Sequence, residues 1–137
     1  MRRTSTALVA AAVLAVAGCG GGDRQSDKQK IEATLNAYYT AFADGDGKTA
    51  CDQLTKVAAD QLVKATRAKD CASAIQAAGQ RPDVKPYTER FRDAKVLSVK
   101  VDGPIAAARV RALGQTRPVP LRLEDGKWKI EGATGAG

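Results

Sequence analysis

The chain has 137 residues, a net charge of +7, 44% hydrophobic residues and no histidine. This length fits one domain behind an N-terminal segment. Without histidine the chain lacks the commonest metal ligand and the side chain that most often serves as a general base near neutral pH. A metal site or an acid–base catalytic site would therefore have to form without histidine.

The N-terminus has the layout of an export signal. Arg2 and Arg3 precede an apolar run over residues 7–17, which is shorter than the ~20 residues that a membrane-spanning helix needs. A twin-arginine signal is the weaker alternative, because the Thr-Ser-Thr that follows the arginines lacks the apolar pair of such signals.

A cysteine follows the apolar run. Val16-Ala17-Gly18-Cys19 resembles the bacterial lipobox, in which a diacylglycerol is attached to the cysteine thiol and a peptidase cuts before that residue. We therefore expect residues 1–18 to be a lipoprotein signal peptide. Cys19 should then carry acyl chains such as palmitate and hold the protein on the extracytoplasmic face of the bacterial cell membrane. The alternative is that Cys19 merely ends an ordinary signal.

Residues 19–26 contain the lipidated cysteine and a flexible tether. The tether reads Gly-Gly-Gly-Asp-Arg-Gln from Gly20 to Gln25. Fully extended, it reaches roughly 25 Å, so the domain should stay close to the membrane. Removing the signal peptide leaves 20 basic and 15 acidic residues, a net charge of +5.

Two cysteines remain after Cys19 is assigned to lipid. Thiols outside the cytoplasm are oxidised, so Cys51 and Cys71 should form one disulfide that contributes roughly 3 kcal/mol. Two free buried thiols or a metal site are the alternatives, and the metal site has few ligands available.

The clearest predicted helix begins at Ser26, which forms a capping box with Gln29, and stops at Asp44-Gly45. Its apolar residues recur at helical spacing: Ile31, Leu35, Tyr38 and Phe42. The acidic residues of Asp44-Gly45-Asp46-Gly47 resemble the start of a calcium loop, but the later ligands are missing. A helix end followed by a new helix explains them better.

Three shorter helices should follow. We expect one at about residues 49–54, which carries Cys51, and one at about 56–68. Asp70 should cap a third that continues through residue 78 and ends at Gly79. Residues 80–86 contain two prolines and are predicted to form a loop.

After Phe91 the apolar residues alternate, which predicts an antiparallel meander with one apolar and one basic face. Turns are expected at Asp102-Gly103 and at residues 124–126. The apolar positions are Leu97, Val99, Val101, Ala106, Ala108, Val110, Ala112, Val119, Leu121, Leu123, Trp128 and Ile130. The basic face should contain Lys100, Arg109, Arg111, Arg122, Lys127 and Lys129.

Two prolines constrain the third strand. The nitrogens of Pro118 and Pro120 point the same way in a strand, and neither can donate a hydrogen bond. The start of this strand should therefore be unpaired on one side.

Helices followed by a meander give the α+β class: N-terminal helices packed on a curved antiparallel β-meander. The segment "IEATLNAYYTAFADGDGKTACDQLT" and the ending "LEDGKWKIEG" resemble the NTF2-like (SnoaL-like, cystatin-like) domains of secreted actinobacterial lipoproteins. The resemblance implies an NTF2-like cone over residues 27–132, followed by a disordered tail at 133–137. It departs from the family between residues 70 and 91, where many members have additional strands.

The resemblance implies a cone that is often open to a small-molecule pocket, but this fold serves both enzymes and binding proteins. Related isomerases and dehydratases use an aspartate or histidine base inside the cone. Here Asp102, Glu124 and Asp125 fall at turns, and only Asp93 is ambiguous. We therefore expect no catalytic residue, no cofactor and no metal, with an isomerase- or dehydratase-type enzyme as the alternative.

A binding protein is the preferred hypothesis. A small apolar ligand could lie beside Tyr38, Phe42, Ala106, Ala108 and Trp128, although the same residues would equally serve close packing of the first helix. A protein partner is a second possibility, and docking of the basic face on an anionic membrane is a third. Nucleic acid is disfavoured by location and by the lack of an aromatic platform. A homodimer is compatible with the family, although the basic face opposes direct face-to-face pairing.

Overall fold

The computed structural model describes residues 26–132 of the chain. The predicted signal peptide, Cys19, nearly all of the tether and the predicted tail at 133–137 lie outside the described residues.

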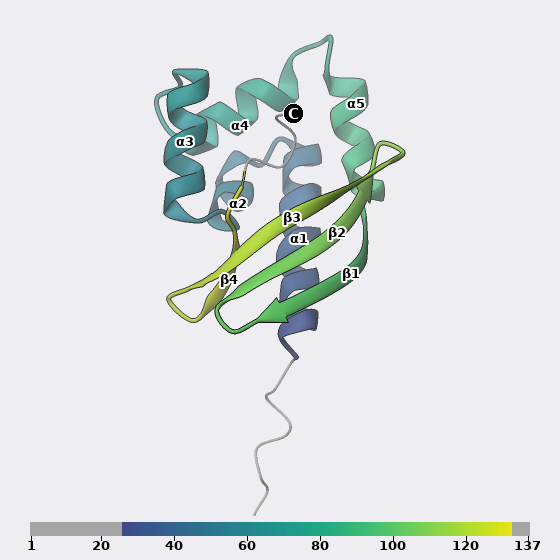
Figure 1. Cartoon of the computed structure of the whole chain (residues 1–137). Helices are drawn as coiled ribbons and strands as arrows, with labels where there is room; N and C mark the ends of the chain where they lie inside the picture. The colour runs from purple at the N-terminus through teal and green to yellow at the C-terminus, as the bar shows by residue number, and fades with distance from the viewer. Residues whose placement is uncertain (1–25, 133–137) are drawn as a thin grey trace, which may run out of the picture.

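Helices come first and a four-stranded sheet follows, which confirms the α+β class (Figure 1). The helical elements are α1 (Asp27–Asp44), α2 (Gly47–Asp52), α3 (Lys56–Thr66), α4 (Cys71–Gln80), α5 (Lys85–Glu89) and the 3-10 helix η1 (Arg90–Asp93). The strands are β1 (Lys95–Asp102), β2 (Ile105–Ala112), β3 (Gln115–Glu124) and β4 (Lys127–Ile130).

Helix α1 begins and ends where the sequence predicts. The Ser26 hydroxyl accepts from the Gln29 N–H, and the Gln29 side chain accepts from the Ser26 N–H. Gly45 ends the helix in the left-handed conformation, with φ of 73°, and its N–H reaches the last carbonyls. Asp46 then caps α2 by accepting from the Thr49 N–H at 3.1 Å. The acidic stretch is therefore a helix end and a helix start.

A disulfide joins the short helices α2 and α4. Cys51 and Cys71 are bonded, with their Cα atoms 6.1 Å apart. The two helices approach so closely that a Cβ on Gly47 would lie 2.1 Å from the Ala72 carbonyl oxygen. Asp70 caps α4 as predicted, because its carboxylate accepts from the Ser73 N–H at 2.7 Å.

Two expectations about this region are wrong. Gly79 lies inside α4 and is buried, and a Cβ there would come within 3.3 Å of the Thr88 methyl group. It therefore allows close approach of α5 and does not end the helix. The predicted loop at 80–86 is shorter, because α5 already begins at Lys85 with Pro86 in its first turn, where a missing N–H costs little.

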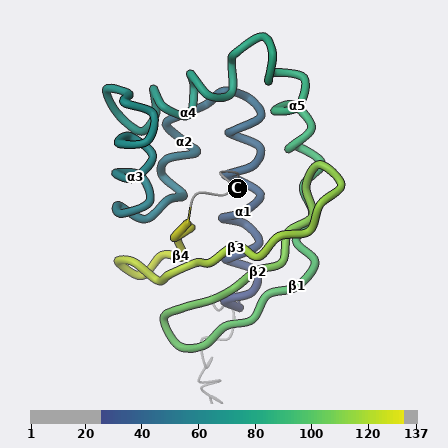
Figure 2. Tube along the Cα trace, turned by 45° about the horizontal axis from the view of Figure 1, so that its top comes forward, coloured from purple at the N-terminus to yellow at the C-terminus, as the bar shows by residue number. Residues whose placement is uncertain are grey.

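The sheet is an antiparallel meander of order β1-β2-β3-β4. The sheet curves over α1, and helices α2 to α5 gather around the C-terminal end of α1 (Figures 1 and 2). The face toward α1, the inner face, carries rows of paired apolar residues such as Val99, Ala108 and Val119. Together with α1 they form the core.

A bulge in β1 corrects one assignment to the apolar face. The pairing register shifts between Val96 and Ser98, so that Val96, which sequence reasoning left out, pairs with buried Val110. Leu97 is the extra residue and is 48% exposed. A bulge inserts one residue and reverses the alternation on either side of it.

The two prolines of β3 behave as predicted. Strand β4 pairs only with residues 121–124 of β3, and the Pro120 carbonyl accepts from the Glu131 N–H at 2.9 Å. Since the nitrogen and carbonyl of one strand residue point to the same side, both proline nitrogens face the β4 side. Pro118 lies beyond the end of that pairing.

Candidate functional site

The residues predicted to line a pocket all belong to the core or pack against it. Ala108 is fully buried, and Tyr38 and Ala106 are nearly so. The Tyr38 and Phe42 rings are stacked with centroids 6.1 Å apart, and Phe91 from η1 packs edge-on against Phe42 at 5.4 Å. With Tyr39 these rings form an aromatic cluster in the C-terminal half of α1.

Trp128 lies at the other end of α1. Its indole N–H donates to the Asp27 carboxylate at 3.1 Å, and its carbonyl accepts from the Thr34 hydroxyl at 3.2 Å. A rise of 1.5 Å per residue separates the Cα atoms of Asp27 and Phe42 by about 22 Å along the helix. The Trp128 indole is thus held at the first turn, away from the Phe42 ring. Sequence reasoning did not identify Asp27, whose only local signal is an acid in a first helical turn.

The predicted basic residues share the outer face of the sheet, which is the face turned away from α1. In the pairing register, Arg111 stands opposite Lys95, Arg109 opposite Ser98 and Lys100 opposite Ala107. Arg122 stands opposite Lys129, and Lys127 opposite Glu124. Directly opposed residues point to the same side of a sheet, so the register places all six predicted residues on this face.

Lys95 is a seventh basic residue on this face that the sequence pattern did not reveal. Counted along an uninterrupted strand, Lys95 and Lys100 would point to opposite faces. The bulge at Leu97 reverses the alternation and brings both to the outer face. No local signal in the sequence marks this bulge.

Two of these seven basic residues already have a partner within the protein. Arg122 forms an ion pair with Glu131 at 2.8 Å, and the Lys129 ammonium donates to the Asp52 carbonyl. Exposed Lys127 on β4 makes no ion pair with any of the described residues, and neither do the four exposed basic residues of β1 and β2: Lys95, Lys100, Arg109 and Arg111. We refer to these four as the basic patch.

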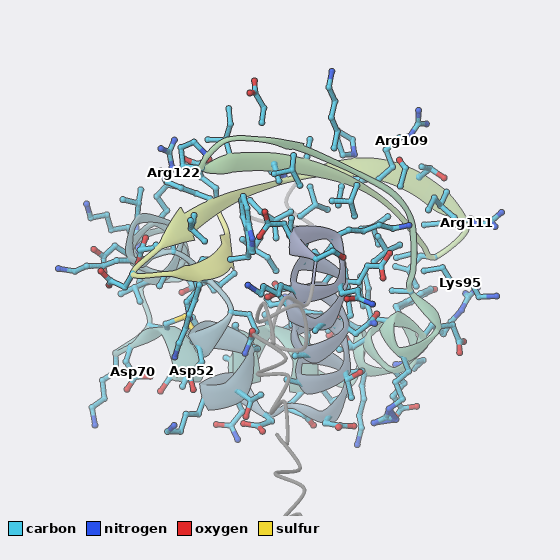
Figure 3. The ribbon with its side chains drawn as sticks, turned by 90° about the horizontal axis from the view of Figure 1, so that it is seen from below. Asp52, Asp70, Lys95, Arg109, Arg111 and Arg122 are labelled. Carbon is cyan, nitrogen blue, oxygen red and sulfur yellow. A yellow bond between two sulfur atoms is a disulfide. The ribbon has the colours of Figure 1, made fainter. Side chains whose placement is uncertain are left out.

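The arrangement of the basic patch is unfavourable for the isolated protein. Lys95 and Arg111 are direct cross-strand neighbours, and like charges in that position destabilise a sheet. Figure 3 shows Arg109, Arg111 and Lys95 pointing away from the sheet and from α1, with no described element over them. An anionic surface placed against this face would remove the repulsion.

The carboxylates with shifted pKa values are helix caps. Hydrogen bonds from the Thr49 side chain and backbone lower the pKa of Asp46. Hydrogen bonds from the Ser73 backbone and side chain lower the pKa of Asp70 in the same way. Asp93 lies exposed in η1. Among the described residues, no three cysteine or acidic side chains gather as a metal site would require.

Comparison with protein-family models, with curated proteins and with solved structures found no match. None of the described helices is long and apolar enough to cross a membrane.

Proposed function

We propose that this protein is a lipid-anchored lipoprotein of the extracytoplasmic membrane face, and that its NTF2-like domain binds a partner without transforming it. The anchor is assigned to Cys19, which follows Val16-Ala17-Gly18. The Cys51–Cys71 disulfide supports an oxidising compartment. A curved sheet wrapped over one long helix is compatible with an NTF2-like cone.

The binding surface in this proposal is the outer face of the sheet. The observation that carries it is the basic patch, whose four side chains are exposed and have no ion pair among the described residues. The inner face is less suited to a ligand, because Ala108 and Trp128 are buried in packed contacts with α1.

The anchor is tested by membrane fractionation of bacteria that express the whole chain or its Cys19→Ser variant. We expect the unchanged chain in the membrane fraction, with a mass increased by lipid. The variant should lose that lipid mass. An unlipidated chain in both cases would contradict the anchor.

The binding surface is tested with a photo-crosslinking amino acid at Ser98, beside Arg109 on the outer face, in intact cells. The matched control places it at exposed Ala65 on α3. We expect adducts at position 98 that disappear when Arg109 and Arg111 are changed to glutamine. Equal adducts at both positions, or adducts that survive these changes, would contradict the assignment.

A small apolar ligand beneath α1 is the second candidate. It is favoured by the small side chains of Ala106 and Ala108 beside the aromatic cluster. Native mass spectrometry of the secreted protein would detect such a ligand as an adduct of defined mass. Ala108→Leu should remove the adduct, whereas Leu97→Thr on the exposed bulge should leave it unchanged. An apo mass for the unchanged chain would exclude this candidate.

A further inference from the structure

We propose that the basic patch docks on anionic lipid headgroups, so that the anchored domain lies on its sheet with α1 facing away from the bilayer. This inference rests on the proposed function and names the partner of the same surface. It follows from the charges of the outer face, from the acidic turns at one end of the sheet and from the length of the tether.

The charges of the patch match a surface of closely spaced phosphates. Lys95 and Arg111 are opposed across β1 and β2, and Arg109 precedes Arg111 by two residues in β2 and lies on the same face. No carboxylate among the described residues forms an ion pair with them. Each basic side chain near an anionic bilayer favours binding by about fivefold, reduced by salt. Guanidinium groups also bind phosphate oxygens in a bidentate manner.

Acidic residues stand at two turns at one end of the sheet. Asp102 ends β1 beside the β1–β2 turn, Asp125 lies in the β3–β4 turn, and both turns lie at the same end of the molecule as the start of α1 (Figures 1 and 2). An anionic bilayer repels these acids. The tether alone would bring this end to the membrane, whereas the basic patch favours contact through the outer face.

The tether is long enough for this orientation. It joins α1, which lies on the inner side of the sheet, and the packed layers of a domain are about 10 Å apart. Adding the length of an arginine side chain gives roughly 20 Å from α1 to the bilayer, within the roughly 25 Å that residues 20–25 can span. Exposed Ile105 also lies on the outer face, opposite Arg122, and can contact the headgroup layer.

The test uses the chain from residue 19 onward with Cys19→Ser, so that no lipid anchor contributes. All core residues lie between Ile31 and Ile130, so this chain retains the whole core. Its binding to phosphatidylcholine vesicles with and without phosphatidylglycerol is measured by co-sedimentation. We expect binding only with phosphatidylglycerol, and weakening as salt is raised.

The decisive comparison is between two triple variants of equal charge. Changing Lys95, Arg109 and Arg111 to glutamine should weaken vesicle binding about a hundredfold. Changing Lys56, Lys64 and Lys69, which are exposed on or near α3, should leave it within about twofold. Circular dichroism checks that each variant is folded, and the salt titration of the parent chain provides a second measurement.

Three results would overturn the inference: equal weakening in both variants, no binding to phosphatidylglycerol vesicles, or equal binding to vesicles that lack it. If the parent chain fails to bind vesicles while photo-crosslinking at position 98 yields protein adducts that depend on the patch, an acidic protein is the partner. In that case only the lipid assignment fails. If Cys19 carries no lipid while the vesicles still bind, the anchor fails and the docking surface stands.

Discussion

At the scale of single residues, several carboxylates have a structural role, whereas the cations of the basic patch have no ion-pair partner among the described residues. Asp27, Asp46 and Asp70 each accept a hydrogen bond that fixes a helix start or the indole of Trp128. The basic patch has no comparable partner among the described residues. These hydrogen bonds stabilise the fold, and this explains the positions of the three acids. The basic patch makes no such stabilising contact with the described residues, so we assign it to binding.

Asp70 gives a pH-dependent prediction. Its pKa is lower in the folded protein because the Ser73 backbone N–H donates to the carboxylate, so its stabilising effect is complete above the ordinary carboxyl pKa and is lost as pH falls through the folded-state value. Asp70→Ala should therefore lower the free energy of unfolding at neutral pH, and this deficit should shrink in acid. Chemical denaturation at both pH values measures it.

The control for this prediction is Asp70→Ser. A serine hydroxyl also accepts from the Ser73 N–H but does not titrate, so this variant should keep the cap at every pH. A deficit of Asp70→Ala that is the same at neutral and acid pH would contradict a role for the carboxylate charge.

At the scale of elements, local signals predicted much of the fold. The capping box at Ser26, the stop at Gly45 and the alternation in β2 depend only on neighbouring residues, and the structure confirms them. Gly79 and the Leu97 bulge could not be predicted, because each depends on an element distant in the chain. For the same reason the sequence predicted six residues of the outer face but missed Lys95.

The bulge predicts an unequal response along β1 and β2. Leu97→Thr should change the free energy of unfolding by less than about 0.5 kcal/mol, because the side chain is already 48% exposed. Val110→Ala, on the inner face, should lower it by about 2 kcal/mol. Urea denaturation of both variants tests this. A larger loss for Leu97→Thr would mean that Leu97 points into the core and that the bulge is absent.

The disulfide predicts the stability of the helical end of the molecule. Cys51 and Cys71 close a loop of 20 residues between α2 and α4. Replacing both with serine should lower the free energy of unfolding by about 3 kcal/mol, since the unfolded chain regains the freedom of that loop. Thermal unfolding compares the variant with the oxidised and the reduced parent chain. Equal stability of all three would contradict the prediction.

At the scale of the whole molecule, one face of the sheet is buried and the other is open. The inner face is buried against α1, and β4 is further tied to the α2–α3 connection, where the Thr55 N–H donates to the Ile130 carbonyl at 2.9 Å. The outer face is covered by no described element (Figure 3). A short tether and an open basic face together define the orientation that we propose for the anchored domain.

This orientation is tested most directly on the proposed lipid-anchored form of the protein in vesicles that contain brominated phosphatidylglycerol, which quenches tryptophan fluorescence at short range. One variant carries Ala107→Trp on the outer face and the other Ala65→Trp on α3; the single native tryptophan, Trp128, is buried and gives the baseline. We predict strong quenching for Ala107→Trp and little for Ala65→Trp. Equal quenching, or stronger quenching on α3, would contradict docking through the outer face of the sheet.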